Sequence, residues 1–203
     1  MENDYIIRQE KPTDYEEVEN LTREAFWNVY RPGCLEHYVL HEYRLRNDFL
    51  PRLDYILEKN GRIIAHVMYA RSYITESDGN KVEIATFGPL GVLPEEQRKG
   101  YGSKLFSYTL GLARKQGIKA VAITGNYDFY RHLGFEKGKD KGIFYSFDRD
   151  ADYFLIKELS KGFFDTVKGE YADPDGYFVD EKDADEFDKK FTPKRKIKTD
   201  SQL

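Results

Sequence analysis

The sequence lacks the features that mark a membrane, secreted or nucleic-acid-binding protein. No apolar run approaches the roughly 20 residues that a membrane helix needs. The first residues, Met1-Glu2-Asn3-Asp4, have neither the basic nor the apolar region of a signal peptide. The single cysteine, Cys34, excludes an internal disulfide, and the formal net charge of -4 offers no general attraction to nucleic acid. We therefore expect a cytoplasmic protein with no nucleic-acid and no membrane partner.

What remains is the composition of one globular domain. The chain has 203 residues, of which 40% are hydrophobic and 15% aromatic. That length suits one domain with a well-covered sheet, with or without an extension, and is too short for two full cores. Because Cys34 has no activating partner nearby in the sequence, we expect a buried or incidental thiol rather than a nucleophile.

The first 50 residues predict one strand and two helices. A short apolar run at 5–8 is typical of a strand. Thr13 and Glu16 have the spacing of a capping box, which predicts a helix that starts there. A second helical pattern covers 35–47, and its many charged residues lead us to expect that it lies over the surface of the fold.

The middle of the chain predicts three antiparallel strands, at 53–58, 63–74 and 82–92. Two turn signals, Asn60-Gly61 and Asp78-Gly79-Asn80, separate them and are typical of β-hairpins. These strands should form the first part of a sheet.

The next segment predicts a mixed α/β (α+β) fold. An amphipathic helix is expected at 102–116, followed by a strand at 120–124 that a right-handed crossover places parallel to the preceding strand. A short helix at 126–133 and a strand at 154–159 complete the core. The sheet should therefore be mixed, and helices should flank it.

The C-terminal part has a different composition, with an acidic stretch at 180–188. We assign 1–168 to the main domain and 169–203 to a charged C-terminal extension. We expect this extension to be a solvated surface; docking of Tyr177 and Phe178 onto the domain is the alternative.

The most informative motif is Gln97-Arg98-Lys99-Gly100-Tyr101-Gly102-Ser103, which joins a predicted strand to a predicted helix. Gly100 and Gly102 let the backbone approach a ligand closely. Successive N–H groups at a helix N-terminus attract anions, and Arg98 and Lys99 add positive charge. The motif indicates a phosphate-binding loop; the alternative is an ordinary turn with solvated basic residues.

A second motif, FYRHLGF at 129–135, follows the next predicted strand, and the two together resemble the GNAT acetyltransferases. That family has a loop with Gln or Arg, two residues, Gly, one residue, and Gly or Ala. Gln97, Gly100 and Gly102 match it. The family also has a tyrosine shortly before a Gly-Phe pair, which Tyr130 matches.

The resemblance spans Tyr5 to Leu159 and is similar to a bacterial subgroup with poorly defined substrates. It implies that 1–168 is a GNAT acetyltransferase domain. Its sheet would be mostly antiparallel, with a central parallel strand pair splayed to admit CoA. It also implies acetyl-CoA as the cosubstrate and no metal.

In this resemblance the backbone of 90–92 pairs with the pantetheine arm, and the loop at 97–103 wraps the pyrophosphate. Pantetheine carries amides spaced like those of a peptide, so a strand end is a suitable partner. The expected cofactor-binding residues are Leu90, Gly91, Val92, Gln97, Arg98, Lys99, Gly100, Tyr101, Gly102, Ser103 and Asn126.

The resemblance implies direct attack of an amine on the thioester in a ternary complex. The backbone N–H of Val92 would stabilise the oxyanion, and Tyr130 would protonate the leaving thiolate. The alternative for Tyr130 is a packed aromatic on a short helix. These two residues, with a base, form the expected catalytic set.

The base is less clear from the sequence. Thr86 stands where some family members have a glutamate, and Glu83 is the nearest carboxylate before it. In a regular strand Glu83 points away from the face of Thr86, so it serves as the base only across a bulge. Other candidates lie in the second predicted helix: Glu36, His37, His41 and Glu42. We expect both histidines to be at the surface or partly packed rather than metal ligands, because no third ligand has suitable spacing.

Aromatic residues gather around the second predicted helix. They are core residues or the lining of an acceptor pocket: Phe26, Trp27, Tyr30, Tyr38 and Tyr43. We expect an N-acetyltransferase whose acceptor is a small-molecule or protein amine, and the acidic C-terminal stretch could cover a neighbouring subunit in a homodimer. The alternative is a non-catalytic acyl-CoA sensor, which the threonine at 86 favours.

Overall fold

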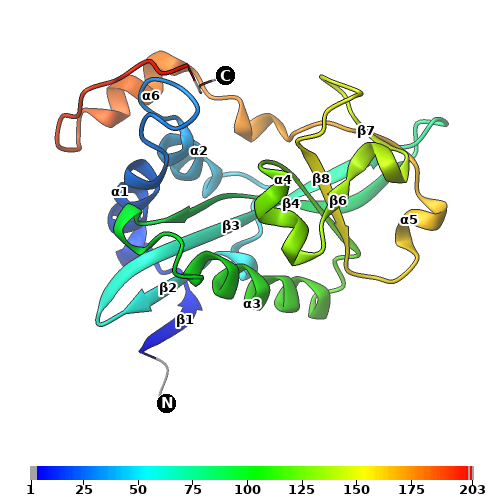
Figure 1. Cartoon of the computed structure of the whole chain (residues 1–203), viewed down its shortest axis with the longest axis horizontal. Coiled ribbons are helices and arrows are strands. Elements are labelled where there is room, and N and C mark those ends of the chain that lie inside the picture. Colours follow the sequence, from blue (N-terminus) through cyan, green and yellow to red (C-terminus); the bar gives the residue numbers. More distant parts are fainter. Residues whose placement is uncertain (1–3, 201, 203) are drawn as a thin grey trace. The chain divides into compact units, whose positions relative to one another are not determined.

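In a computed structural model, the nine strands of the described residues form one mixed sheet (Figure 1). The structure describes residues 4–200 and 202. The N-terminal residues Met1, Glu2 and Asn3, which bear on the expected lack of a signal peptide, lie outside the described residues. The strands hydrogen-bond in the order β1-β2-β3-β4-β5-β8-β6, and β9 joins β3 to β7. The strands are β1 (Tyr5–Gln9), β2 (Tyr55–Lys59), β3 (Arg62–Thr75), β4 (Lys81–Val92), β5 (Ala120–Thr124), β6 (Glu136–Lys137), β7 (Ile143–Tyr145), β8 (Phe154–Glu158) and β9 (Gly169–Tyr171).

Six α-helices accompany the strands in the described residues. The helices are α1 (Tyr15–Phe26), α2 (Glu36–Tyr43), α3 (Tyr101–Lys115), α4 (Tyr127–Tyr130), α5 (Phe163–Thr166) and α6 (Glu181–Asp188). Within the described part of the chain, none is long and apolar enough to cross a membrane. The mixed α/β fold class expected from the sequence is confirmed.

The chain divides into two compact units. Unit 1 contains Met1–Met68, Pro89–Phe106 and Asp175–Leu203, and unit 2 contains Tyr69–Gly88 and Ser107–Pro174. The long strands β3 and β4 and the helix α3 each have residues in both units.

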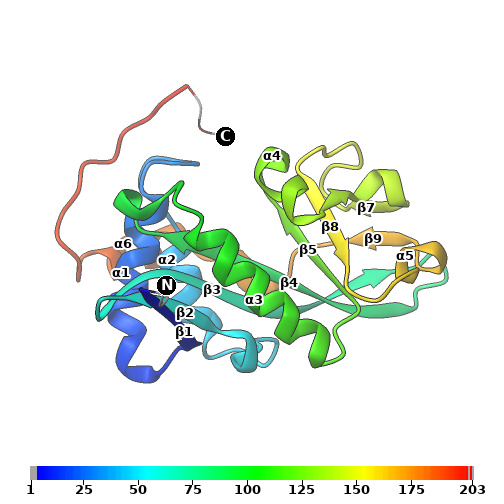
Figure 2. The same ribbon diagram turned by 60° about the horizontal axis from the view of Figure 1, so that its bottom comes forward.

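In unit 1, β1 pairs antiparallel with β2, and β2 with the first half of β3. Asn60 and Gly61 both have positive φ, 51° and 76°, as the predicted two-residue hairpin requires. The helices α1, α2 and α6 lie side by side (Figures 1 and 2). Apolar residues from the helices and strands of this unit are buried: Val18, Leu21, Val39, Leu40, Leu53, Ile56, Leu57 and Ile64.

The first helix begins slightly later than predicted. Pro12, Thr13 and Asp14 form a 3₁₀ turn, and α1 begins at Tyr15. The Asp14 carboxylate accepts the N–H of Lys11 at 2.8 Å, which closes this 3₁₀ turn, and Arg8 holds the same carboxylate at 2.6 Å. Asp14 occupies the N-cap position of α1 but makes no side-chain capping hydrogen bond to it. The predicted cap therefore fails, because the carboxylate next to the helix bonds to residues before it.

The second helix is shorter and more buried than its charge pattern predicts. It ends at Tyr43, and His37, Val39, Leu40 and Tyr43 are all buried. The expectation of a surface helix fails because α6 covers a further face of α2.

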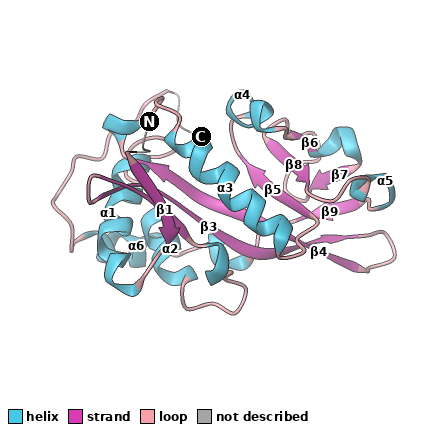
Figure 3. Cartoon of the chain, turned by 90° about the horizontal axis from the view of Figure 1, so that it is seen from below, coloured by secondary structure: helices cyan, strands magenta, loops and turns pink. Residues whose placement is uncertain are grey.

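In unit 2, β4 and β5 run parallel and β5 pairs antiparallel with β8, which also pairs with β6 (Figure 3). A second parallel pair joins β7 to β9. The strands β6, β7 and β9 have two or three residues each and give no readable alternation in sequence. The core of this unit consists of Ile74, Ile84, Ala120, Ala122, Ile143, Ala151, Phe154, Ile156, Phe164 and Tyr171.

The C-terminal part is docked rather than solvated. Residues 169–171 form β9 in the sheet, and the Tyr177 ring lies 5.0 Å from that of Tyr43. The Phe178 side chain stays 59% exposed. The division of the chain at residue 168 stays a prediction.

Candidate functional site

The parallel pairing between β4 and β5 is short. Among the described residues it joins Ala85 to Val121 and Thr86 to Ala122. The Thr86 hydroxyl donates to the Ala122 carbonyl at 3.0 Å. Gly88 then has a φ of +126°, which departs from regular strand geometry. The backbone of β4 therefore departs from regular strand geometry at Gly88, just before the residues predicted to contact a cofactor.

The last part of β4 packs closely on α1. A side chain at Gly91 would place its Cβ 3.1 Å from Leu21 Cδ2 and 3.6 Å from the Cβ of Ala25. A larger residue at this position would require the Leu21 side chain to move by a few tenths of an ångström. Leu90 and Val92, on either side, are half-buried. The predicted pantetheine segment is thus a strand end held rigidly against a helix.

The glycine loop follows directly and is tied back to this strand. The side-chain amide of Gln97 donates to the Val92 carbonyl at 3.0 Å. Arg98 and Gly100 both have positive φ, 61° and 84°. Residues 97–100 are exposed, and α3 starts at residue 101. Backbone with alternating handedness ahead of a helix N-terminus orients N–H groups toward one point, which is the geometry that binds phosphate.

The remaining loop residues contribute through the backbone. Tyr101 is buried, with its ring at 6.0 Å from that of Tyr5 and with Lys59 Nζ 4.9 Å from its centre. A Cβ on Gly102 would lie 3.1 Å from Val92 Cγ2, so this glycine allows helix and strand to approach. The side chain of Lys99 pairs with Glu96 at 3.1 Å. Among the described residues no ion pair includes Arg98, the other basic residue of this loop.

Tyr130 lies in an aromatic cluster in unit 2. Its ring meets the rings of Phe87 and Phe135 edge-on, at 5.7 and 5.4 Å. Gly125 makes room for it, since a Cβ there would lie 2.8 Å from Tyr130 Cε2. The Asn126 side chain caps α4 by accepting the N–H of Asp128 at 2.8 Å. The cap occupies the amide oxygen of Asn126, and its cofactor role stays a prediction.

The candidate base Glu83 is on the surface. Its side chain is 62% exposed, and Oε2 lies 3.3 Å from Nε of Arg71. Thr86 is buried, and its hydroxyl is engaged with the backbone of β5. A catalytic role for Glu83, and the oxyanion role of the Val92 N–H, stay predictions.

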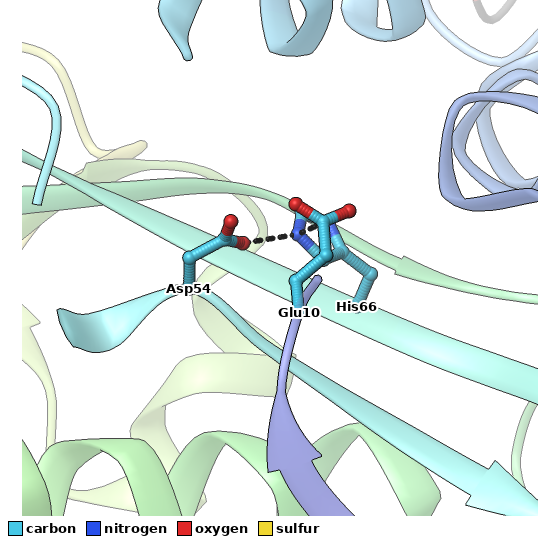
Figure 4. Close-up of side chains that lie close together, drawn as sticks. All are labelled: Glu10, Asp54 and His66. Atoms are coloured by element: carbon cyan, nitrogen blue, oxygen red, sulfur yellow. Dashed lines mark hydrogen bonds and ion pairs between the residues drawn. The ribbon is translucent and has the colours of Figure 1, made fainter. Parts of the chain in front are cut away.

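Sequence reasoning missed a buried polar cluster in unit 1 (Figure 4). Nε2 of His66 lies 2.7 Å from Oδ1 of Asp54 and 4.0 Å from Oε1 of Glu10. Arg44 donates to both carboxylate oxygens of Glu10, at 2.7 and 3.1 Å, and to Glu19 at 2.7 Å. These residues come from five separate segments, so no local sequence motif indicates the cluster.

The cluster fits a shared proton better than a metal ion. Glu10, Asp54 and His66 each offer one ligand atom within 4.8 Å of the others. An ion placed among them would lie beside the Arg44 guanidinium, which binds the same oxygen of Glu10. Burial raises the pKa of Glu10 to about 8 and that of Asp54 to about 6, and it lowers the pKa of His66 to about 4. We therefore interpret the cluster as a hydrogen-bonded network with a neutral Glu10 and a neutral His66 near pH 7.

The raised pKa of Glu10 predicts a stability that falls with pH. The unfolded carboxyl loses its proton near pH 4.5 and the folded one near 8, so the folded state binds more protons between these values and stability decreases as pH rises. His66 acts in the opposite direction, but only below pH 6.5. Between pH 6.5 and 8 urea unfolding should therefore show a decline of up to about 1.4 kcal/mol per pH unit. Glu10→Gln should flatten it, and a variant that keeps the full decline would refute this assignment.

The two histidines of α2 do not form a metal pair. Nε2 of His37 lies 3.0 Å from Asp188, and Nδ1 of His41 lies 2.8 Å from Glu19. His37 is fully buried, which corrects the expectation of a surface or partly packed residue. Cys34 is buried 3.3 Å from His37, and burial raises the pKa of its thiol, as expected for an unreactive cysteine.

Comparison with known proteins identifies acetyltransferases as similar in sequence and in fold. A curated relative, the uncharacterized N-acetyltransferase YjhQ of Escherichia coli (strain K12), is 30% identical over 94 residues. The match covers 45% of this chain and 51% of YjhQ, so this chain spans about half the length of the curated relative.

Solved structures share the fold. The GNAT family N-acetyltransferase YhbS from Escherichia coli, crystallised with CoA, superposes with a TM-score of 0.73 at 20% identity, covering 86% of this chain and 92% of YhbS. A GNAT family acetyltransferase from Brucella melitensis, crystallised with acetyl-CoA, gives 0.68 at 23% identity and covers 86% and 98%. The model of the acetyltransferase (GNAT) domain family matches residues 6–138, well over half of the sequence. The chain therefore belongs to the GNAT acetyltransferase family.

Proposed function

We propose that the protein is an N-acetyltransferase that transfers the acetyl group of acetyl-CoA to an amine acceptor, a small molecule or a protein, in a ternary complex. The observation that carries the proposal is the exposed loop at 97–100, whose positive φ angles at Arg98 and Gly100 precede α3. Two proteins of the same fold were crystallised with CoA and with acetyl-CoA, which supports this choice of donor.

Binding of the donor would use backbone groups in two places. The loop amides and the start of α3 would hold the pyrophosphate, with Arg98 adding a charge. Leu90, Gly91 and Val92 would pair with the pantetheine amides as a neighbouring strand does. The packing of Gly91 on α1 makes this strand end rigid before the ligand arrives, which lowers the entropy lost on binding.

The transfer would need an oxyanion donor and an acid. As the amine attacks the thioester carbon, the carbonyl oxygen becomes negative, and the Val92 N–H would stabilise it. The C–S bond then breaks, and the Tyr130 hydroxyl would protonate the leaving sulfur. An alkylammonium with a pKa near 10.4 is neutral in only about 1 molecule in 2,500 at pH 7, so a proton must leave the amine first. Glu83, acting directly or through water, is our candidate for that step.

The direct test mixes the protein with acetyl-CoA and three amines of different class: spermidine, tyramine and a peptide with a free N-terminal alanine. Release of CoA thiol, together with the mass of an acetylated amine, supports the proposal. Tight CoA binding by calorimetry without CoA release from any amine in a broad panel indicates the non-catalytic sensor instead.

Replacement of Tyr130 by phenylalanine tests the acid. We expect kcat to fall about 100-fold, the lower end of the range for a lost proton donor, while acetyl-CoA affinity stays within about twofold. The ring contacts with Phe87 and Phe135 survive in this variant. Tyr127→Phe, on the exposed side of the same helix, is the control and should leave kcat unchanged. Equal turnover in Tyr130→Phe and wild type would remove Tyr130 from the chemistry.

A further inference from the structure

Residues 181–200 and 202, which we name the C-terminal clip, lie outside the part of the chain that matches the family model. We propose that this clip holds the loop at 27–33 in place and thereby shapes the acceptor side of the site. The proposal rests on the function proposed above. In this proposal the C-terminal clip positions the loop at 27–33 and is not a solvated tail.

The clip is anchored by a buried ion pair. Asp188, at the end of α6, accepts from Nε and Nη2 of Arg23 at 2.5 and 3.1 Å. The Arg23 side chain is only 1% exposed, and its guanidinium also lies over the Trp27 ring at 4.2 Å. His37 approaches the same carboxylate at 3.0 Å. A bidentate pair with a buried arginine fixes the end of α6 in one position on α1.

Aromatic packing and a second ion pair extend the anchor. The Phe187 ring lies 4.4 Å from His41 and 5.2 Å from Tyr38, both on α2. Lys190 Nζ lies 2.7 Å from Oε2 of Glu19, a side chain that is itself buried. The clip thus contacts both α1 and α2 before it reaches the loop.

The last part of the clip binds the loop through hydrogen bonds centred on Asn28. Its amide group donates to the Arg195 carbonyl at 3.1 Å and accepts the N–H of Ile197 at 3.0 Å. The side chain of Gln202 donates to the Asn28 carbonyl at 3.0 Å, and the Trp27 indole N–H donates to Arg195 at 3.1 Å. Asn28 has a φ of 61°, a conformation that few residues adopt without such support.

This loop continues from the helix that packs on the cofactor strand. Ala25, one turn before the loop, lies within contact distance of the position where Gly91 would carry a Cβ. Gly91 belongs to the segment that we propose to pair with pantetheine. A loop fixed at the end of that helix is therefore placed beside the donor strand, where it can contact an incoming amine. The aromatic residues Trp27 and Tyr30 offer apolar surface there.

Two asparagine variants test the clip in the full-length protein. Asn28→Gly removes the side chain that binds the clip, together with its bond to the Gly33 N–H inside the loop at 2.8 Å, but tolerates the positive φ. Asn60→Gly is the matched control, because Asn60 also has positive φ but lies in the β2–β3 turn. Loss of the bond from the Ile197 N–H to the Asn28 side chain should speed hydrogen exchange of the Ile197 amide at least tenfold in Asn28→Gly, and Asn60→Gly should leave that exchange unchanged.

The acceptor side is tested by steady-state kinetics of the same variants, with whichever of spermidine, tyramine and the alanine peptide the wild type acetylates fastest. We expect KM for that amine to rise about fivefold in Asn28→Gly, with kcat and the Kd of CoA within about twofold. Gln202→Ala, which changes the clip and leaves the loop sequence intact, should shift both readouts in the same direction.

Equal exchange in Asn28→Gly and Asn60→Gly would overturn the clip. Faster exchange with an unchanged amine KM would overturn its role at the acceptor side. The exchange measurement needs no acceptor, so a failure of the proposed acetyltransferase activity is distinguishable from a failure of the clip.

Discussion

The variant Gly100→Val is expected to bind CoA at least 100-fold more weakly than the wild type. Gly100 has a φ of +84°, and no protein atom lies within 4 Å of the position a Cβ would take. The added side chain would therefore clash with nothing in the protein and would project from the loop where the phosphate should approach. A β-branched residue also disfavours this left-handed conformation by about 1–2 kcal/mol, so the loop amides would lose their alignment.

A matched control separates strain from ligand exclusion. Gly117 has a φ of +85° and likewise has no atom within 4 Å of its Cβ position, but it follows the C-terminal end of α3. Gly117→Val should lose similar stability and keep CoA affinity. Calorimetry with CoA measures the Kd of both variants and so distinguishes backbone strain from exclusion of the phosphate. If Gly100→Val binds CoA as tightly as Gly117→Val does, the phosphate assignment of the loop is wrong.

The largest loss of stability is expected for Arg44→Met. The Arg44 side chain is 4% exposed and neutralises a region where Glu10, Glu19 and Asp54 are buried. Methionine fills much of the volume, but it removes the hydrogen-bond donor of Glu10 and one cationic partner of Glu19, which keeps Lys190. It also removes the positive charge that favours the ionised form of Asp54. Removing one partner from a buried ion pair costs about 3–5 kcal/mol, and we expect a loss of this size in urea unfolding at pH 7.

The pH dependence of that loss provides a second measurement. At pH 5 protonation of Asp54, whose pKa is raised to about 6, reduces the uncompensated charge, so the difference from wild type should shrink. Arg46→Met is the control, since Arg46 pairs with Asp48 at the surface and such pairs contribute below about 1 kcal/mol. Equal losses in the two variants at pH 7 would contradict the buried network.

Local patterns predicted the elements that carry the donor site. The strand at 120–124 was predicted to the residue, and the helix after the glycine loop to within one residue at each end. Both have strong periodicity and clear stop signals, such as Gly117 with its positive φ. The motif at 97–103 depends on neighbours in sequence, so its geometry could be anticipated without knowing the rest of the fold.

Contacts between segments that are distant in the chain could not be predicted from the sequence. Arg44 and Glu10 are 34 positions apart, and Arg23 and Asp188 are 165 apart. Charged residues are mostly exposed, so a pattern argument assigns all four to the surface. Only packing of the helices on one another and on the sheet buries them and makes pairing necessary.

The sequence by itself determined the fold class, the family motifs and the loop proposed to hold phosphate, because periodicity and turn chemistry are local. The tertiary structure decided which charges are buried, that Asp14 binds Arg8 instead of capping the first helix, and that the C-terminal segment docks on α1 and α2. These outcomes depend on burial, which raises the free energy of an unpaired charge and so selects partners far away in the chain.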